Sequence, residues 1–135
     1  MIELFVYGTL MEGEQSGGLL SGCPSTPARA RGDLFRLPAG YPAMVPLPPS
    51  TPNLHGDTWV HGELRLLEDP RRLSLLDTFE GVDRGLYKRV KIQVNAESRG
   101  VWAWTWVMTP EQIRAKGGVK IKGGDWKRIS PKRGA

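Results

Sequence analysis

The sequence predicts an α+β domain built on a small, mostly antiparallel β barrel with short flanking helices. Stretches in which apolar and polar residues alternate recur along the chain, whereas only one strong helical pattern lies near its middle. A chain of 135 residues, of which 39% are hydrophobic and 24% charged, has the size and composition of one folded domain. We expect this domain to span residues 1–128, followed by a basic tail over residues 129–135.

In the first half of the chain, strands alternate with turn-rich and proline-rich segments. Residues 2–7 alternate as a strand that ends at Gly8, and residues 29–37 can form a second strand. Between these strands, residues 11–27 are rich in Gly, Ser and Pro and leave room for at most one helical turn. Residues 38–52 hold six of the eleven prolines, which predicts a long irregular loop that wraps the fold or rims a site.

A strand and the clearest helix follow near the middle of the chain. Residues 59–67 have the pattern of a strand, with Val60, Leu64 and Leu66 on one face. The helix is predicted by its ends and by its apolar spacing. The residues that carry this pattern are Asp69 as the cap, Pro70 at the first helical position, Leu73, Leu76 and Phe79 on one face, and Gly81 as the stop.

The last third of the chain predicts a hairpin and a second, shorter helix. Residues 86–94 and 101–108 alternate as two strands around a turn at residues 95–100. Thr109 can start a short helix that ends at the glycine pair Gly117-Gly118. The tryptophans of the final strand, Trp102, Trp104 and Trp106, share one face. Such a stripe could stack bases or sugars, but at this spacing it is more typical of a barrel wall.

The positive charge of the chain is concentrated near its C-terminus. The net charge is +5, yet residues 114–135 alone carry eight bases and one acid, which leaves the rest of the chain slightly acidic. We interpret this segment as a solvated tail; the alternative is contact with a nucleic acid or an acidic partner. The single cysteine, Cys23, agrees with a reducing compartment. Because residues 1–10 lack a basic leader and no apolar run approaches the ~20 residues of a membrane span, we expect a cytoplasmic protein without a membrane partner.

The residue types available exclude several kinds of active site. His55 and His61 are the only histidines, and their spacing from Cys23 matches no zinc site, so we expect no metal. No G-x-S-x-G elbow and no phosphate-binding G-x-x-x-x-G-K loop occurs in the chain. The residues therefore give no support to a zinc site, a serine triad or a phosphate-binding loop.

Glu80 is the acidic residue with the most distinctive position, because it follows the apolar face of the predicted helix and precedes Gly81. A carboxylate at a helix C-terminus lies beside unsatisfied carbonyl groups and the negative end of the helix dipole, which raises its pKa. Such a group could act as a general base near neutral pH. The alternative is a surface glutamate in a capping turn, and the residues alone favour that alternative.

Six short segments carry a resemblance that spans nearly the whole chain: Phe5-Val6-Tyr7-Gly8-Thr9-Leu10, Gly40-Tyr41-Pro42-Ala43, Gly62-Glu63-Leu64, Leu76-Asp77-Thr78-Phe79-Glu80-Gly81, Tyr87-Lys88-Arg89 and Gly124-Asp125-Trp126. In their order and spacing they resemble the γ-glutamylcyclotransferase-like superfamily, and most closely its branch of γ-glutamylamine cyclotransferases and AIG2-like proteins. This resemblance implies a small β barrel with flanking helices. It also implies an enzyme that closes a γ-glutamyl group to 5-oxoproline and releases a free amine.

The resemblance assigns roles to particular residues. It implies that Glu80 is the general acid/base and that the turn formed by Tyr7, Gly8, Thr9 and Leu10 presents backbone N–H groups to the γ-glutamyl substrate. Further residues are assigned to the pocket or, as an alternative, to structural roles: Tyr41 at the rim, Tyr87 in the wall, Arg89 paired with a carboxylate, and Asp77 beside Glu80. No cofactor and no nucleic acid are implied, and the oligomeric state stays open.

The chain departs from the family pattern at two places that concern the choice of substrate. The family commonly has a tyrosine where this chain has Arg65, and often an aromatic residue where it has Val107 and Met108. Two other functions remain as alternatives. One is a small-molecule-binding protein that keeps the pocket without catalysis, and the other is a nucleic-acid-associated protein that uses the basic C-terminus and the tryptophans.

Overall fold

The computed structural model describes residues 1–52 and 58–129 of the chain. Its strands and helices follow one another in the order β1 (Ile2–Val6), η1 (Gly17–Leu20), β2 (Ser25–Arg36), β3 (Pro42–Pro46), β4 (Trp59–Leu67), α1 (Pro70–Phe79), η2 (Val82–Arg84), β5 (Lys88–Ala96), β6 (Arg99–Val107), α2 (Pro110–Lys116), β7 (Val119–Lys120), η3 (Lys122–Gly124) and η4 (Trp126–Arg128), where η marks a 3₁₀ helix.

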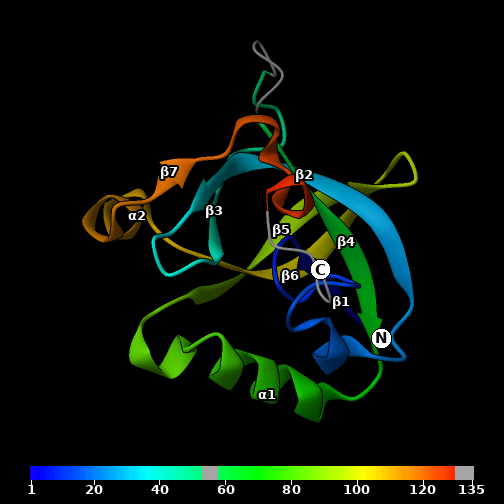
Figure 1. Cartoon of the computed structure of the whole chain (residues 1–135). Helices are drawn as coiled ribbons and strands as arrows, with labels where there is room; N and C mark the ends of the chain where they lie inside the picture. Colours follow the sequence, from blue (N-terminus) through cyan, green and yellow to red (C-terminus); the bar gives the residue numbers. More distant parts are fainter. Residues whose placement is uncertain (53–57, 130–135) are drawn as a thin grey trace.

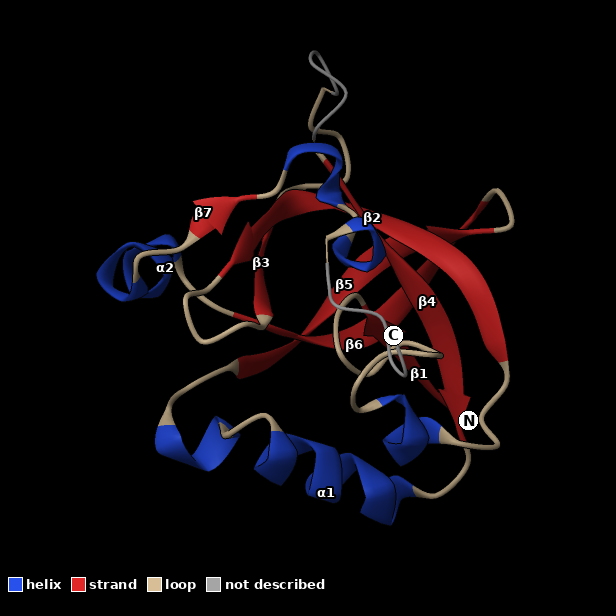
Figure 2. Ribbon diagram, viewed as in Figure 1, coloured by secondary structure: helices blue, strands red, loops and turns tan. Residues whose placement is uncertain are grey.

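Five of the strands close into a barrel (Figure 1). The sheet runs in the order β3-β2-β4-β1-β6-β5, and β2 also pairs with β5, which completes the ring. Its pairs are antiparallel except for β1 with β6. Figure 2 shows the helices outside this ring, with α1 running along the lower end of the barrel. The predicted fold, an α+β barrel with short flanking helices, is confirmed.

The expectation of an irregular loop over residues 38–52 is wrong in part, because this segment contains β3. β3 pairs antiparallel with β2, from Arg36 opposite Pro42 to Gly32 opposite Pro46. The prolines Pro42 and Pro46 stand at the two ends of the strand, and β3 is an edge strand, so the missing N–H donors interrupt no central ladder. The density of prolines predicted an irregular segment, and the short strand β3 within it was therefore missed.

The other predicted strands are present with shifted ends. β2 begins at Ser25, earlier than expected, and β5 and β6 run further into the predicted turn. The hairpin between them has a two-residue loop, because Ala96 pairs with Arg99. Glu97 and Ser98 both have positive φ angles, which is the requirement of the tight turn that matches strand twist. The rarity of this conformation for these two residue types is why the sequence suggested a longer turn.

Both helices begin and end as predicted. The Asp69 side chain accepts a hydrogen bond from the Arg71 N–H at 3.0 Å, and Pro70 opens α1. α1 ends at Phe79, followed by Glu80 and by Gly81 with φ of 70°. Thr109 caps α2 by accepting the Gln112 N–H at 3.1 Å, and the Gln112 side chain accepts the Thr109 N–H in return. The predicted single turn before β2 is η1. None of the helices in the described residues is long and apolar enough to cross a bilayer.

β4 is buried on both faces, whereas the sequence predicted only one apolar face. Val60 is buried as expected, but Glu63, Arg65 and Leu67 on the other face are more buried than Leu64. The guanidinium of Arg65 donates to the backbone carbonyls of Leu20 and Cys23, so the segment after β1 covers this face. Two charged residues in the middle of a strand do not look like core residues, and the sequence pattern marked only the opposite face, with Val60, Leu64 and Leu66, as apolar.

The expectation of a solvated basic tail is wrong for the described part of the C-terminal segment. Ile121 and Trp126 are buried, and Gly124 packs so closely on β4 that a Cβ atom there would lie 1.9 Å from the carbonyl oxygen of Trp59. Lys120 pairs with Asp33, and Lys127 pairs with Glu63. The described segment around Ile121 and Trp126 is therefore packed on the barrel, and residues 130–135 of the predicted tail lie outside the described residues.

Candidate active site

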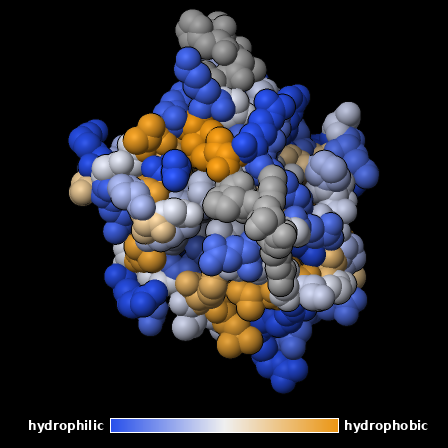
Figure 3. Space-filling view, in the orientation of Figure 1, coloured by the Kyte–Doolittle hydropathy of each residue, from blue (hydrophilic) through white to orange (hydrophobic). Residues whose placement is uncertain are grey.

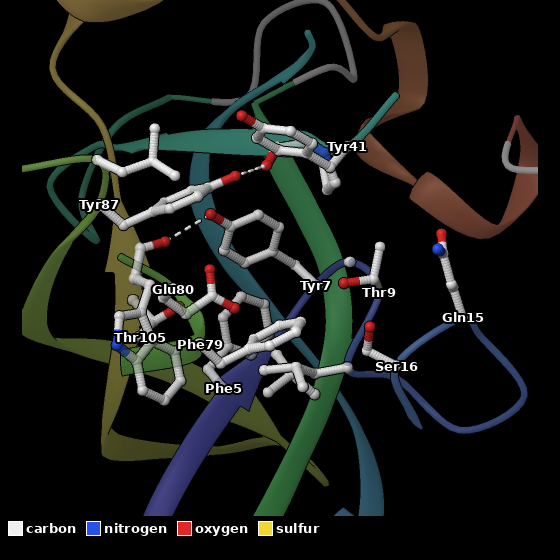
Figure 4. A pocket seen from close by; sticks show the side chains of 16 residues that line it. Phe5, Tyr7, Thr9, Gln15, Ser16, Tyr41, Phe79, Glu80, Tyr87 and Thr105 are labelled. Atoms are coloured by element: carbon white, nitrogen blue, oxygen red, sulfur yellow. Dashed lines mark hydrogen bonds between the residues drawn. The ribbon is translucent and has the colours of Figure 1, made fainter. Parts of the chain in front are cut away.

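A cavity of about 300 Å³ opens between the end of β1, the C-terminus of α1 and the segment before β3 (Figure 4). Seven of the eight site residues expected from the sequence line it: Tyr7, Gly8, Thr9, Leu10, Tyr41, Glu80 and Tyr87. The further lining residues are Phe5, Val6, Gln15, Ser16, Pro42, Phe79, Leu86, Thr105 and Trp106. Folding thus brings together positions that are separated by most of the chain.

The turn after β1 is shaped by two contacts within its own segment and one with β3. The Met11 N–H donates to the Gly8 carbonyl at 3.1 Å, and the Ser16 N–H donates to the Thr9 carbonyl at 2.7 Å. On its other side the turn touches Pro42, whose Cγ atom would lie 2.5 Å from a Cβ atom at position 8. Gly8 is required here because any side chain would displace Pro42.

Three consecutive backbone donors of this turn are unused. The N–H groups of Gly8, Thr9 and Leu10 donate no hydrogen bond to any residue in the described part of the chain. Because an unsatisfied N–H next to a cavity costs free energy unless a ligand or water accepts its hydrogen, such a group is suited to bind an anionic or carbonyl oxygen. The turn can therefore hold a carboxylate or a developing oxyanion.

Glu80 provides the acidic group of the cavity. It caps α1, and its N–H donates to the Leu76 carbonyl at 2.9 Å, which fixes the backbone from which the side chain extends. In Figure 4 its carboxylate points into the cavity beside Tyr7. Within the described residues nothing donates a hydrogen bond to this carboxylate or pairs with it as an ion.

Burial raises the pKa of Glu80 from its ordinary value of 4.5 to about 7. The raised pKa agrees with the direction expected from the sequence, but its cause is removal from water in the cavity. The alternative of an exposed surface glutamate does not describe its position. A carboxyl group with this pKa exchanges its proton close to neutral pH, as a general acid/base must.

Two of the three tyrosines that line the cavity, Tyr7 and Tyr87, use their hydroxyl groups in hydrogen bonds within the wall. Tyr7 donates to the Trp106 carbonyl and accepts from the Met44 N–H at 3.1 Å, while Tyr87 donates to the Pro42 carbonyl. Burial, and next the charge of Glu80, raises the pKa of Tyr7; burial is also the largest cause of the raised pKa of Tyr87. Both phenols therefore stay protonated near neutral pH and connect β1, β3, β5 and β6 around the site.

Arg89 does not line the cavity. Its Nε atom donates to the two carboxylate oxygens of Asp77 at 2.9 and 3.1 Å, and its guanidinium lies 4.4 Å from the centre of the Trp104 ring. Trp106 donates to the same carboxylate at 2.9 Å. Of the two roles expected for Arg89, the pairing with a carboxylate is the one observed. Asp77 thereby ties α1, and with it Glu80, to β5 and β6.

Replacing Asp77 with alanine is expected to destabilise the protein by about 1.5–3 kcal/mol, because it removes a charged acceptor that serves two buried or half-buried donors. Chemical denaturation monitored by tryptophan fluorescence measures this loss. Asp83→Ala, in the neighbouring exposed turn η2, is the matched control and should change stability by less than about 0.5 kcal/mol. Equal stabilities of the two variants would contradict this role of Asp77.

Several lining residues escaped the sequence analysis although a signal existed for some of them. Phe5 precedes Tyr7 by two positions and so shares its face of β1. Phe79 stands next to Glu80 and is 45% exposed, which fits a position at the rim. Figure 3 shows an apolar area over α1, where Leu75 and Phe79 are exposed. The Thr105 hydroxyl is buried without a hydrogen-bond partner among the described residues, and no pattern in the sequence indicated it.

Arg65, the departure thought to affect the substrate, lies outside the cavity wall. It faces the segment after β1 and pairs with Glu63 at 3.7 Å. Among the described residues, no cluster of three His, Cys, Asp or Glu side chains could hold a metal ion, and His55 lies outside the described residues.

The sequence and the fold of the whole chain were compared with those of known proteins. A family profile described as "Gamma-glutamyl cyclotransferase, AIG2-like" matches residues 4–128. No curated protein sequence matches the chain. Among solved structures, YkqA from Bacillus subtilis is 28% identical with a TM-score of 0.66, and the match covers 94% of this chain and 40% of YkqA. The chain therefore spans less than half the length of that relative.

Two further solved structures share the fold at lower sequence identity. An AIG2-like protein from Mus musculus is 22% identical with a TM-score of 0.63, over 97% of this chain and 91% of the mouse chain. A protein described as γ-glutamyl cyclotransferase is 16% identical with a TM-score of 0.60, over 86% of this chain and 80% of its own.

Proposed function

Because the chain belongs to the AIG2-like γ-glutamyl cyclotransferase family, we propose that it is an enzyme that releases 5-oxoproline and a free amine from a γ-glutamyl compound. One observation carries the proposal. Among the described residues, a carboxyl group without a hydrogen-bond or ionic partner, whose pKa is about 7, shares a cavity with three backbone N–H groups that donate to no other residue. A proton carrier and an oxyanion-binding turn are the two elements that an intramolecular aminolysis needs.

In the proposed reaction the substrate attacks itself. Glu80 as carboxylate takes a proton from the α-ammonium group, and the freed amine attacks the γ-carbonyl carbon. A ring C–N bond forms, and the carbonyl oxygen becomes an oxyanion. When the oxyanion reverts to a carbonyl, the bond to the leaving nitrogen breaks and Glu80 returns a proton to that nitrogen. A second proton passes from the ring nitrogen to the leaving amine, so no net proton is gained or lost.

The cavity supports this reaction by holding the substrate bent. Nucleophile and electrophile belong to one molecule, and effective molarities of roughly 10⁵–10⁸ M are reached when such groups are well oriented. We assign binding of the α-carboxylate or the oxyanion to the N–H groups of Gly8, Thr9 and Leu10. Tyr7, Tyr41 and Tyr87 enclose the γ-glutamyl chain; the rings of Tyr41 and Tyr87 lie 6.3 Å apart.

The proposed chemistry oxidises and reduces nothing, so we expect it to need no cofactor. We place it in the cytoplasm, where a lone buried thiol such as that of Cys23 stays reduced. The leaving amine extends toward the rim at Phe79, Gln15 and Ser16.

The pH profile of kcat/KM is expected to report the Glu80 carboxyl group. Because the base must be ionised to take the first proton, kcat/KM should rise about tenfold per pH unit well below pH 7 and level off above it. Initial rates of 5-oxoproline release between pH 5 and pH 8.5 measure the profile. A rate that is flat between pH 5 and pH 8 would contradict Glu80 as the base.

The direct test of the proposed function is a screen of γ-glutamyl compounds, with 5-oxoproline release followed by mass spectrometry. The compounds should include γ-glutamyl peptides, γ-glutamyl-ε-lysine and γ-glutamyl polyamines. Release from at least one compound by the wild type is the expected result. Binding of 5-oxoproline without release from any compound would instead support a non-catalytic binding protein.

A further inference from the structure

A cluster of charged side chains lies on the outer face of β4, on the side away from the cavity. Glu63 is 8% exposed and Arg65 is 2% exposed. Lys127 of η4 donates to Glu63 Oε2 at 3.0 Å, and Arg65 lies 3.7 Å from Glu63 Oε1. Buried charges are retained in proteins when they are paired and hydrogen-bonded, and this carboxylate has both a lysine and an arginine beside it.

Glu63 also connects this cluster to the turn that we assign to substrate binding. Its Oε1 atom accepts the backbone N–H of Glu12 at 3.0 Å, two positions after Leu10. The same segment returns to the cavity at Gln15 and Ser16, and the Ser16 N–H closes on the Thr9 carbonyl. Residues 8–16 are therefore held on the cavity side by their own hydrogen bonds and on the outer side by Glu63.

The third member of the cluster comes from the opposite end of the chain. Lys127 lies 64 positions after Glu63, on the orange-red segment that crosses the front of the barrel in Figure 1. Its backbone N–H donates to the Asp125 side chain at 3.1 Å, and its neighbour Trp126 is buried. Close packing of Gly124 on Trp59 fixes the segment against β4. Lys127 is thus held beside Glu63 by a closely packed part of the domain.

We propose that Lys127 and Glu63 are positioning residues for the substrate-binding turn, so that the C-terminal η4 sets how tightly the site binds its γ-glutamyl ligand. Lys127 donates to the buried Glu63 carboxylate and orients it toward the Glu12 N–H. That hydrogen bond in turn fixes the backbone that presents the N–H groups of Gly8 to Leu10. The proposal rests on the proposed function for the identity of the ligand, but the mechanical link rests on the contacts alone.

Arg128 provides a matched control for Lys127. It is the next residue on η4, it carries the same charge, and its side chain is exposed and paired only with the nearby Asp125 in the described structure. Lys127→Met and Arg128→Met each remove one positive charge and keep an unbranched apolar side chain. Lys127→Arg keeps the charge and the ability to donate to Glu63.

The first measurement compares these variants in 5-oxoproline release from a compound identified by the screen. Lys127→Met should raise KM by about tenfold with kcat changed less than about twofold, because loss of one charge-assisted hydrogen bond loosens the turn and leaves Glu80 in place. Arg128→Met and Lys127→Arg should keep the wild-type KM. An unchanged KM in Lys127→Met, with an active wild type, would overturn the inference while leaving the proposed function standing.

The second measurement does not depend on turnover. Amide hydrogen exchange of residues 8–16, followed by mass spectrometry on the free protein, should be faster in Lys127→Met than in the wild type and unchanged in Arg128→Met. Equal exchange in the three proteins would overturn the link even if no γ-glutamyl compound proved to be a substrate. Failure of the screen together with faster exchange in Lys127→Met would overturn the proposed function and sustain the link.

Discussion

Replacing Glu80 with glutamine is expected to lower kcat/KM for 5-oxoproline release by about 10²–10⁴-fold, the contribution typical of a positioned general acid/base. Glutamine has nearly the same shape but cannot accept the proton of the α-ammonium group or return it to the leaving nitrogen. Substrate binding should be retained, because the N–H groups of the turn are backbone atoms. A Glu80→Gln protein with wild-type turnover would show that another group carries the proton.

The same variant has a signature in stability that separates loss of catalysis from loss of fold. The pKa of Glu80 is about 7 in the folded protein against 4.5 ordinarily, so the folded state holds its proton more tightly between these values. Stability of the wild type should therefore fall as pH rises from 4.5 to 7, by at most about 3 kcal/mol. Glu80→Gln has no such titrating group at this position. Urea denaturation should therefore show that its free energy of unfolding, relative to that of the wild type, is higher at pH 8 than at pH 5.

Replacing Gly8 with alanine is expected to lower kcat/KM by about 10²-fold. A displacement of roughly 1 Å in the groups that position a substrate, here the N–H groups of the turn, has an effect of this size. The new Cβ atom would meet Pro42 at 2.5 Å, so either the turn or β3 must move. A shift of Pro42 also moves the carbonyl to which Tyr87 donates. Both walls of the cavity are therefore affected by one methyl group.

Gly18→Ala is the matched control for this variant. Gly18 lies in the same segment, in η1, and a Cβ atom there would have no neighbour within 4 Å. Steady-state kinetics and a thermal melt of both variants distinguish a local effect on the site from a general effect on folding. If Gly8→Ala kept more than half of the wild-type kcat/KM, the close packing of Pro42 on the turn would have no functional importance.

The parts of the fold that could be predicted from the sequence are those in which local signals agree. The cap at Asp69, the proline after it and the glycine at position 81 define α1 because each acts on its own backbone. The alternation of apolar and polar residues predicted β5 and β6, because each strand has one more buried and one more exposed face. The closure of the ring by β2 and β5 depends on contacts between distant strands, which no local pattern contains.

What escaped prediction depended on pairing across the chain. β3 is stabilised by β2, by the Met108 N–H and by the Tyr7 hydroxyl, none of which can be inferred from a proline-rich stretch. Glu63 and Arg65 are buried because a separate segment and η4 supply their partners. Charge at these positions predicts exposure unless those partners are known.

The candidate site was predictable to a different degree for each residue. The resemblance named Glu80 and the turn from Tyr7 to Leu10, which all line the cavity, whereas the local sequence around Glu80 alone favoured a surface residue. Arg89 shares a motif with Tyr87, yet Tyr87 lies just before β5 and lines the cavity, whereas Arg89 within β5 pairs with Asp77 instead. Thr105 and Phe79 needed the structure, because membership of a cavity wall is a property of the assembled barrel.

The hydrogen bond from the Tyr7 hydroxyl to the Trp106 carbonyl joins residues 99 positions apart, and β1 meets β6 beside it. A contact this distant in sequence is costly to form early, because the intervening chain must lose its freedom before the contact is gained. On the ribosome, the first strand must wait until the last strand of the ring has emerged before the cavity wall is complete. Until β6 has joined β1, the cavity wall is therefore incomplete and the apolar face of β1 lacks its partner strand.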